Sequence, residues 1–293
     1  MKIRDQNKEK LLELLRSTDE AKVAQAMDIA ETVMDQEIAI IFADYWTLCE
    51  WALEYELNNV AEREDELLPE YIAKFNQTEL RFVGIYATYV PQAIGLLQQA
   101  ESLNLHYNGF NTFPMEILQL QNLRELDLSE NSLKQIPPEI CQLKNLETLK
   151  LDYNQLTTLP PEIGLLPNLK HLILSNNELT SIPTEIGLLQ ALQNLNLYDN
   201  QLKTIPSEIG KLSNLKKLEL WENELIDLPD EIGNLSSLQD LFLGNNYGIK
   251  QLRKDVFQKL QNLKTLDIGG SGIAHQTPEL KSWLPGCFVD NGM

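Results

Sequence analysis

Residues 146–168, with the sequence LETLKLDYNQLTTLPPEIGLLPN, decide the fold of this chain because neighbouring stretches repeat them. Residues 123–145, 169–191, 192–214 and 215–237 align with this stretch leucine by leucine, at a fixed period of 23 residues. A constant period in this range indicates one small supersecondary unit, which buries its apolar face only by stacking on copies of itself. We therefore predict a solenoid built from these stacked copies.

Within each copy, numbered from its first leucine, positions 4 and 6 are leucines in an LxLx alternation. This period of two predicts a short strand that sends the leucines inward and positions 3, 5, 7 and 8 to a solvent face. Position 9 is asparagine in seven successive copies: Asn108, Asn131, Asn154, Asn177, Asn200, Asn223 and Asn246. Because a buried amide needs hydrogen-bond partners, we expect these side chains to bond the backbone of their own and the adjacent copy.

The second half of each copy carries proline at position 15, isoleucine at position 18 and, in four copies, glycine at position 19. Proline fixes φ and lacks an N–H donor, which leaves room for only a short 3₁₀ or single helical turn on the return path. We expect Gly164, Gly187, Gly210 and Gly233 to provide a chain reversal with positive φ.

The pattern LxxLxLxxNxLxxLPxEIGxLxx resembles the leucine-rich repeat, and is most similar to the 23-residue intracellular class found in Ras-binding scaffold proteins and in bacterial proteins. The resemblance implies an α/β fold: a right-handed solenoid with a curved parallel sheet on its concave side and 3₁₀ or extended segments on its convex side. It also implies a binding function, but the matching residues are the buried ones and name no partner.

We predict two regions, a helical N-terminal cap over residues 1–76 and a solenoid over residues 77–293. Residues 77–99 are interpreted as a degenerate capping repeat, residues 100–262 as seven repeats, and residues 263–293 as a last strand with a C-terminal cap. Ser17 to Glu20 predict a capping box at the start of a helix. The helical region either only covers the first strand or forms a docking or dimerising module that leaves Trp46 or Trp51 exposed.

The chain is strongly acidic, with 24 basic and 43 acidic residues and a formal net charge of −19. This charge disfavours nucleic acid and anionic membranes and favours basic proteins or peptides as partners. The sequence shows no signal-peptide core and no apolar membrane span, so we expect a cytoplasmic location, although a signal-independent export route stays open.

No pattern of catalytic or ligand-binding residues emerges from the sequence. His106 and His171 fall three repeats apart, too far to share a metal ion. The segment from Gly269 to Gly272 matches neither a phosphate loop nor a nucleophile elbow. We predict no cofactor, no metal and no enzymatic activity, and interpret Cys287 as a small buried apolar residue.

The predicted site is the concave face at positions 3, 5, 7 and 8. Tyr153, Ile173, Tyr198, Trp221 and Phe242 fall on nearby strands and form an expected aromatic and aliphatic patch. Carboxylates with few basic neighbours are expected to surround it: Asp127, Glu130, Asp152, Asp199, Glu219, Glu222 and Asp240. Aromatic anchors inside a charged rim are typical of protein interfaces, although cross-strand stabilisation of the sheet alone also explains neighbouring aromatics.

We therefore expect a non-enzymatic scaffold that binds a protein or peptide with a basic, partly apolar surface. An exported effector or adhesion protein that uses the same face is the alternative, and an enzyme with a thiol nucleophile is disfavoured because Cys287 has no basic neighbour in the sequence. The oligomeric state is not predicted.

Overall fold

The computed structural model describes residues 10–33, 36–53 and 69–292. The chain divides into two compact units: residues 1–109 with 114–123, and residues 110–113 with 124–293. Parts of the expected cap over residues 1–76, namely 1–9, 34–35 and 54–68, lie outside the described residues. The boundary expected at residue 76 stays a prediction.

The first unit combines helices with the first two strands. Its elements are α2 (Glu20–Val33), α3 (Gln36–Leu53), α4 (Pro69–Phe75), β1 (Glu79–Arg81), η2 (Gln92–Leu96), β2 (Ser102–Asn104) and η3 (Met115–Gln119), where η denotes a 3₁₀ helix. Strands β1 and β2 pair in parallel, with Leu80 opposite Leu103. The predicted pattern of strand, turn and 3₁₀ helix thus holds for both repeats of this unit.

Two sequence-based expectations for the helical region need correction. Trp51 is buried, and its indole N–H donates to the carbonyl of Tyr89 at 2.8 Å, so it is not an exposed docking residue. The N-cap of α2 is Asp19 rather than Ser17, because Asp19 Oδ1 accepts hydrogen bonds from the N–H groups of Ala21 and Lys22. A side chain directly before the first helical residue reaches these free N–H groups, as N-caps generally do.

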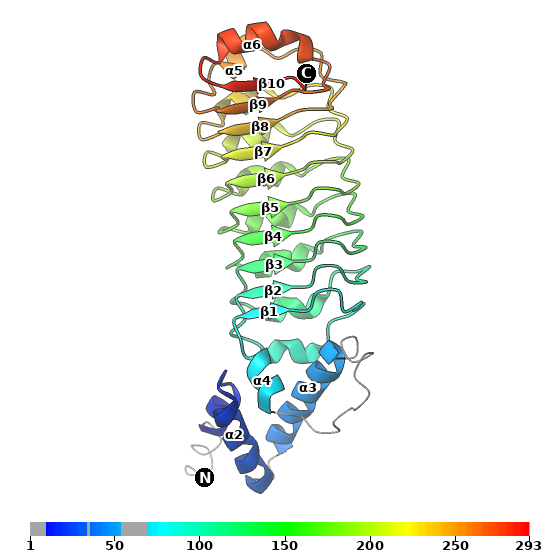
Figure 1. Ribbon diagram of the computed structural model, residues 1–293, viewed down its shortest axis with the longest axis vertical. Helices are drawn as coiled ribbons and strands as arrows, with labels where there is room; N and C mark the ends of the chain where they lie inside the picture. Colours follow the sequence, from blue (N-terminus) through cyan, green and yellow to red (C-terminus); the bar gives the residue numbers. More distant parts are fainter. Residues whose placement is uncertain (1–9, 34–35, 54–68, 293) are drawn as a thin grey trace. The chain divides into compact units, whose positions relative to one another are not determined.

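The second unit is a stack of eight parallel strands (Figure 1). They are β3 (Glu125–Asp127), β4 (Thr148–Lys150), β5 (His171–Ile173), β6 (Asn194–Asn196), β7 (Lys217–Glu219), β8 (Asp240–Phe242), β9 (Thr265–Asp267) and β10 (Phe288–Asp290). Each strand pairs only with its neighbours in chain order, in a register that places position 3 opposite position 3. The period of 23 residues therefore corresponds to one step in the stack.

The return segments are short helices; those between β3 and β8 lie behind the sheet in Figure 1, whereas α6 is drawn at the top end of the stack. They are η4 (Pro138–Gln142), η5 (Pro161–Leu165), η6 (Thr184–Leu188), η7 (Ser207–Lys211), η8 (Asp230–Asn234), α5 (Lys254–Phe257), η9 (Ala274–Gln276) and α6 (Thr277–Trp283). The repeats with proline at position 15 have 3₁₀ helices, as predicted, and the repeat that lacks this proline has the α-helical turn α5.

The core of the second unit is the space between the strands and the return helices. The leucines at positions 4 and 6, such as Leu218 and Leu220, are fully buried, and so are the isoleucines at position 18. The asparagine at position 9 makes the expected ladder. Asn177 Nδ2 donates to Leu174 O at 3.0 Å in its own repeat and to Leu151 O at 2.9 Å in the preceding one.

The glycines at position 19 have a different role from the predicted one. None of Gly164, Gly187, Gly210 and Gly233 has positive φ. A Cβ atom built on Gly210 would lie 2.3 Å from Glu231 O in the next repeat, and one on Gly164 would lie 2.3 Å from Glu185 O. In these four repeats glycine leaves room for the close approach of the next return segment, and it does not provide a chain reversal with positive φ.

Candidate functional site

The candidate site is the strand face of the second unit, defined here as the residues at positions 3, 5, 7 and 8 of its repeats. The register of β4 to β8 brings Lys150 opposite Ile173, Ile173 opposite Asn196, and Glu219 opposite Phe242. These side chains are half-buried, while the leucines between them are buried. The alternation predicted from the LxLx pattern is therefore confirmed for positions 3 to 6.

Position 8 departs from this alternation. A strand that continued past position 7 would turn position 8 inward, beside the leucines. Instead, every residue at this position from Glu130 to Asn245 has a left-handed backbone, with φ between 50° and 57°. This conformation, uncommon outside glycine and asparagine, keeps the side chains of Tyr153 and Asp199 exposed next to those of position 7.

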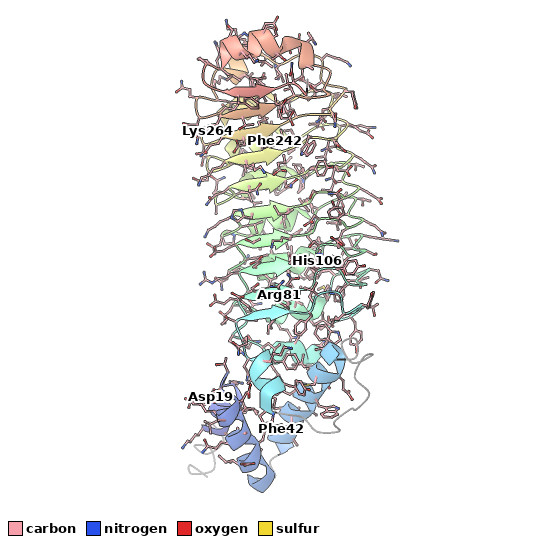
Figure 2. The ribbon with its side chains drawn as sticks, viewed as in Figure 1. Asp19, Phe42, Arg81, His106, Phe242 and Lys264 are labelled. Atoms are coloured by element: carbon pink, nitrogen blue, oxygen red, sulfur yellow. The ribbon has the colours of Figure 1, made fainter. Side chains whose placement is uncertain are left out.

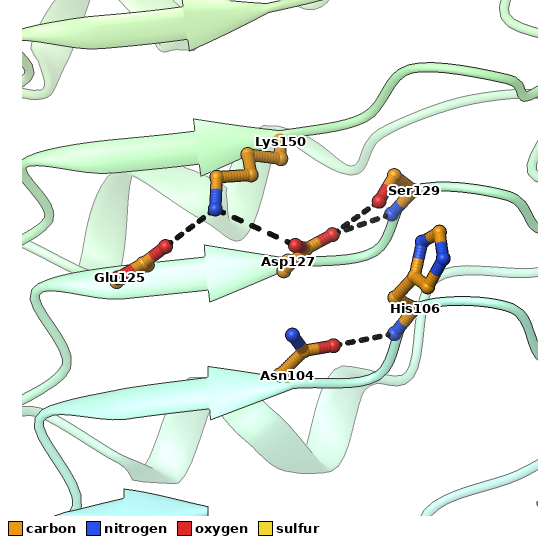
Figure 3. Close-up of polar contacts among 6 residues, drawn as sticks. All are labelled: Asn104, His106, Glu125, Asp127, Ser129 and Lys150. Carbon is orange, nitrogen blue, oxygen red and sulfur yellow. Dashed lines mark hydrogen bonds and ion pairs between the residues drawn. The ribbon is translucent and has the colours of Figure 1, made fainter. Parts of the chain in front are cut away.

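A side-chain hydrogen bond from position 5 to the backbone of position 7 also supports the turn. Asn196 Oδ1 accepts a hydrogen bond from the N–H of Tyr198 at 2.9 Å, and Asp267 Oδ1 accepts one from Gly269 at 2.8 Å. Asp127 does the same for Ser129 in Figure 3, where its carboxylate also accepts from the Ser129 hydroxyl. An aspartate or asparagine at position 5 is the sequence signal for this turn, and the prediction of the site did not include it.

The aromatic patch divides into two groups. Tyr198 and Trp221, on adjacent repeats, stack with ring centroids 4.4 Å apart and an interplanar angle of 28°. Phe242 lies on the strand face of β8 (Figure 2) and has the ammonium group of Lys217 over its ring, 5.2 Å from the centroid. Tyr153 is 53% exposed, and Ile173 is half-buried between Lys150 and Asn196 on β5.

The acidic rim is more neutralised than the sequence led us to expect. Lys150 Nζ lies 2.7 Å from Glu125 Oε1 and 3.6 Å from Asp127 Oδ2 (Figure 3). Burial opposes the charge of Lys150, but both carboxylates more than offset this and raise the pKa of the lysine. Lys217 forms an ion pair with Glu219 in the same way.

The remaining carboxylates lie toward positions 7 and 8. Asp199 and Glu130 are exposed, Asp152 and Glu222 are half-buried, and Glu222 Oε1 accepts a long hydrogen bond from Asn245 at 3.4 Å. Burial, then Glu222, Asp199 and Tyr153, raise the pKa of the Tyr198 hydroxyl. The carboxylates of Glu222 and Asp199 therefore act on the stacked pair at Tyr198.

The surroundings of Cys287, which include Asp240, disfavour its thiolate form. Burial, and secondarily Asp240, raise the pKa of the Cys287 thiol to about 11. Cys287 is half-buried, less than predicted, and its neighbour Phe288 is 65% exposed on β10. Within the described part of the chain, no three histidine, cysteine, aspartate or glutamate residues are arranged to hold a metal ion. No helix among the described residues has the length and apolar character that a membrane span requires.

Two family models match the sequence, one described as a leucine-rich repeat region over residues 161–279 and one as a leucine rich repeat over residues 98–156. No curated protein matches the chain.

Among solved structures, the chain resembles the ectodomain of the plant membrane receptor kinase GASSHO1/SCHENGEN3 from Arabidopsis thaliana, in complex with CASPARIAN STRIP INTEGRITY FACTOR 2. The identity is 33% and the TM-score 0.58, over 68% of this chain and 25% of that one. A TDR receptor structure matches at 29% identity and a TM-score of 0.60, over 69% of this chain and 36% of that one.

A leucine-rich repeat protein of Leptospira interrogans is 30% identical over 69% of this chain and 75% of its own, with a TM-score of 0.39. The chain thus spans a quarter of the GASSHO1/SCHENGEN3 ectodomain and about a third of the TDR receptor. The membership of the 23-residue intracellular class stays a prediction. The repeats, the parallel strands with their 3₁₀ returns and the two family matches together show that this chain belongs to the leucine-rich repeat proteins.

Proposed function

We propose that the protein is a non-enzymatic scaffold that binds a protein or peptide partner on the strand face of its second unit. The observation that carries this proposal is the stacked pair Tyr198 and Trp221, which stays partly exposed on a face whose neighbouring carboxylates are not all neutralised. Tyrosine and tryptophan are enriched among the residues that dominate binding energy at interfaces. The partner would have a basic and partly apolar surface, because the site combines aromatic rings with negative potential.

The similarity to receptor ectodomains agrees with this proposal. The GASSHO1/SCHENGEN3 structure is a complex with CASPARIAN STRIP INTEGRITY FACTOR 2, so a related repeat array binds another molecule. The alternative, that the aromatic pair serves only the sheet, accounts for about 0.2–1 kcal/mol of cross-strand stabilisation. It predicts no effect of these residues on binding.

The test is the double variant Tyr198→Ala with Trp221→Ala, used as bait for affinity capture from the native lysate and compared with the unmodified protein. Capture of the specific partner should fall at least tenfold, while the thermal melt followed by circular dichroism stays nearly unchanged.

The matched control is Leu165→Ala with Leu188→Ala, which removes two side chains that are 49% and 53% exposed on the return helices η5 and η6. This variant should capture as well as the unmodified protein. If capture survives the aromatic double variant, the strand face is not the site.

We also propose that the protein acts in the cytoplasm. The described cysteines, Cys49, Cys141 and Cys287, are free thiols, which suits a reducing compartment. An exported effector or adhesion protein that uses the same face is the competing possibility. Cell fractionation with an antibody to the native protein separates the two, since recovery of the protein outside the cells would contradict the cytoplasmic proposal.

A further inference from the structure

The stacked aromatic pair belongs to a strip of side chains that carries no basic residue. The aromatic–acidic strip, as we name it, comprises positions 7 and 8 of four successive repeats: Asp152, Tyr153, Ser175, Asn176, Tyr198, Asp199, Trp221 and Glu222. The lysines of the strand face lie at positions 3 and 5, where Lys150 and Lys217 already pair with carboxylates of the same two positions. Asp199 and Glu222 therefore directly follow the two stacked rings in the chain, at positions that hold no basic residue in these four repeats.

The geometry of the pair selects the shape of a ligand group. The two ring centroids are 4.4 Å apart, close to the spacing of about 4.8 Å between neighbouring strands. The rings are also close to parallel, so they form a flat stack rather than a cage with rings at right angles. Because the inner faces of the two rings cover each other, a planar group would stack on the outer face of one ring.

The surroundings of the pair select the charge of that group. Asp199 and Glu222 directly follow Tyr198 and Trp221 in the chain. Burial first, and then Glu222, Asp199 and Tyr153, raise the pKa of the Tyr198 hydroxyl. The same face already shows a cation over an aromatic ring, where Lys217 Nζ lies 5.2 Å from the centroid of Phe242. A cation held over a ring near carboxylates is thus a contact that this surface makes within its own structure.

Among the side chains of proteins, the arginine guanidinium is both planar and permanently charged, and it donates five hydrogen bonds in one plane. Lysine offers the charge without the flat shape, and a neutral planar group offers the shape without the charge. We infer that the partner places an arginine side chain on the Tyr198–Trp221 stack, with its N–H groups directed to the carboxylates of Asp199 and Glu222. This inference rests on the proposed function, and it specifies which group of the partner the site recognises.

The test uses three synthetic twelve-residue peptides that differ at one central position within a glycine and serine sequence. The position holds arginine, lysine or citrulline, the last of which keeps the planar shape of arginine without its charge. Binding to the full chain is followed by nuclear magnetic resonance titration at millimolar peptide concentration. We expect the arginine peptide to bind at least tenfold more tightly than the citrulline peptide and several-fold more tightly than the lysine peptide.

Two conservative protein variants locate the effect. Asp199→Asn with Glu222→Gln removes two charges but keeps both shapes, and should reduce the preference for arginine over citrulline to less than threefold. The control Glu231→Gln removes one exposed carboxylate at η8, among the return helices, and should leave the preference unchanged.

Equal binding of the arginine and citrulline peptides, no measurable binding of the arginine peptide, or an unchanged preference in the Asp199 and Glu222 variant would each overturn the inference. A different result would reject the proposed function, namely undiminished capture of the partner by the Tyr198 and Trp221 double variant. A partner that still requires the aromatic pair while the arginine peptide does not bind would reject only the arginine contact.

Discussion

A buried asparagine at position 9 ties each repeat to the preceding one. Asn177 donates to the carbonyls of Leu174 and Leu151, and its Oδ1 accepts from the N–H of Leu156 at 3.0 Å. Two of these three partners belong to the preceding repeat, so one side chain satisfies buried backbone groups on both sides of the boundary between repeats. The same arrangement recurs at Asn154 and Asn200.

The first prediction is that Asn177→Ala lowers the free energy of unfolding by about 3 kcal/mol, because buried backbone groups left without partners cost about 1–3 kcal/mol each. Urea unfolding followed by circular dichroism measures the change. The neighbouring exposed variant Glu178→Ala should change stability by less than about 0.5 kcal/mol. Equal stability of the two variants would contradict the role assigned to the asparagine ladder.

The second prediction concerns the thiols. Burial raises the pKa of Cys287 to about 11 and that of Cys49 to about 12. Because the thiolate is the reactive form, a raised pKa leaves little of it at neutral pH. Iodoacetamide at pH 7.5, with peptide mass spectrometry, should therefore modify Cys287 at least tenfold more slowly in the native protein than in urea. Equally fast modification in both states would reopen the case for a thiol enzyme.

At the residue scale, the sequence identifies the buried positions well, but it does not identify the left-handed backbone of the turn at position 8. The asparagine ladder follows from a polar residue at a fixed place in an apolar repeat. The left-handed backbone at position 8 does not, because Tyr153, Glu130 and Glu222 are residue types that rarely adopt it. The surrounding hydrogen bonds impose it: the N–H of Tyr153, for example, donates to Ser175 O at 3.0 Å in the next repeat.

At the scale of elements, neighbouring return helices approach each other closely at the glycines of position 19. Each of the 3₁₀ helices η4 to η8 begins after a proline whose ψ lies between 142° and 152°, which directs the chain into the turn, as at Pro206 before η7. The glycine at position 19 then lets the backbone of the next helix approach. The sequence predicts the proline turn from the chemistry of proline, but the approach of the next helix depends on a residue one repeat further along.

The third prediction is that Gly210→Ala destabilises the protein by about 1–3 kcal/mol, as overpacking generally does. Without a clash the same change would stabilise by about 0.4–1 kcal/mol, because alanine restricts the unfolded chain. The added Cβ would lie 2.3 Å from Glu231 O, so the clash decides the sign. Cys141→Ala, at the equivalent position of an earlier repeat, removes bulk and serves as the control with little effect in thermal unfolding. A stabilised Gly210 variant would show that the helices are not in close contact.

At the scale of the molecule, the net charge of −19 and the strand face determine how a partner would approach. Surface charge speeds the encounter of oppositely charged proteins, and salt screens it over about 8–10 Å. The fourth prediction is that association of the captured partner, measured by surface plasmon resonance, slows at least tenfold between about 50 and 500 mM salt. An association rate that does not depend on salt would argue against a basic partner.

The fold was predictable from the sequence because every repeat carries the same pattern of residues. A position that departs from the pattern in one repeat can therefore be interpreted from the other repeats. The site was predictable only as a set of outward positions. Lys150 pairs with Asp127 on the neighbouring strand and Lys217 pairs with Glu219 on its own strand. Both pairs depend on side-chain lengths and rotamers, which the pattern does not encode. The stack of Tyr198 on Trp221 was predictable from the sequence, because both residues occupy position 7 of adjacent repeats.

Hydroxyl-radical footprinting of the protein with and without its captured partner tests the central claim most directly. The account predicts that Tyr198 and Trp221 become at least fivefold less reactive in the complex, while Leu165 and Leu188 on the return helices keep their reactivity. Protection of the two leucines with unchanged oxidation of Tyr198 and Trp221 would contradict it.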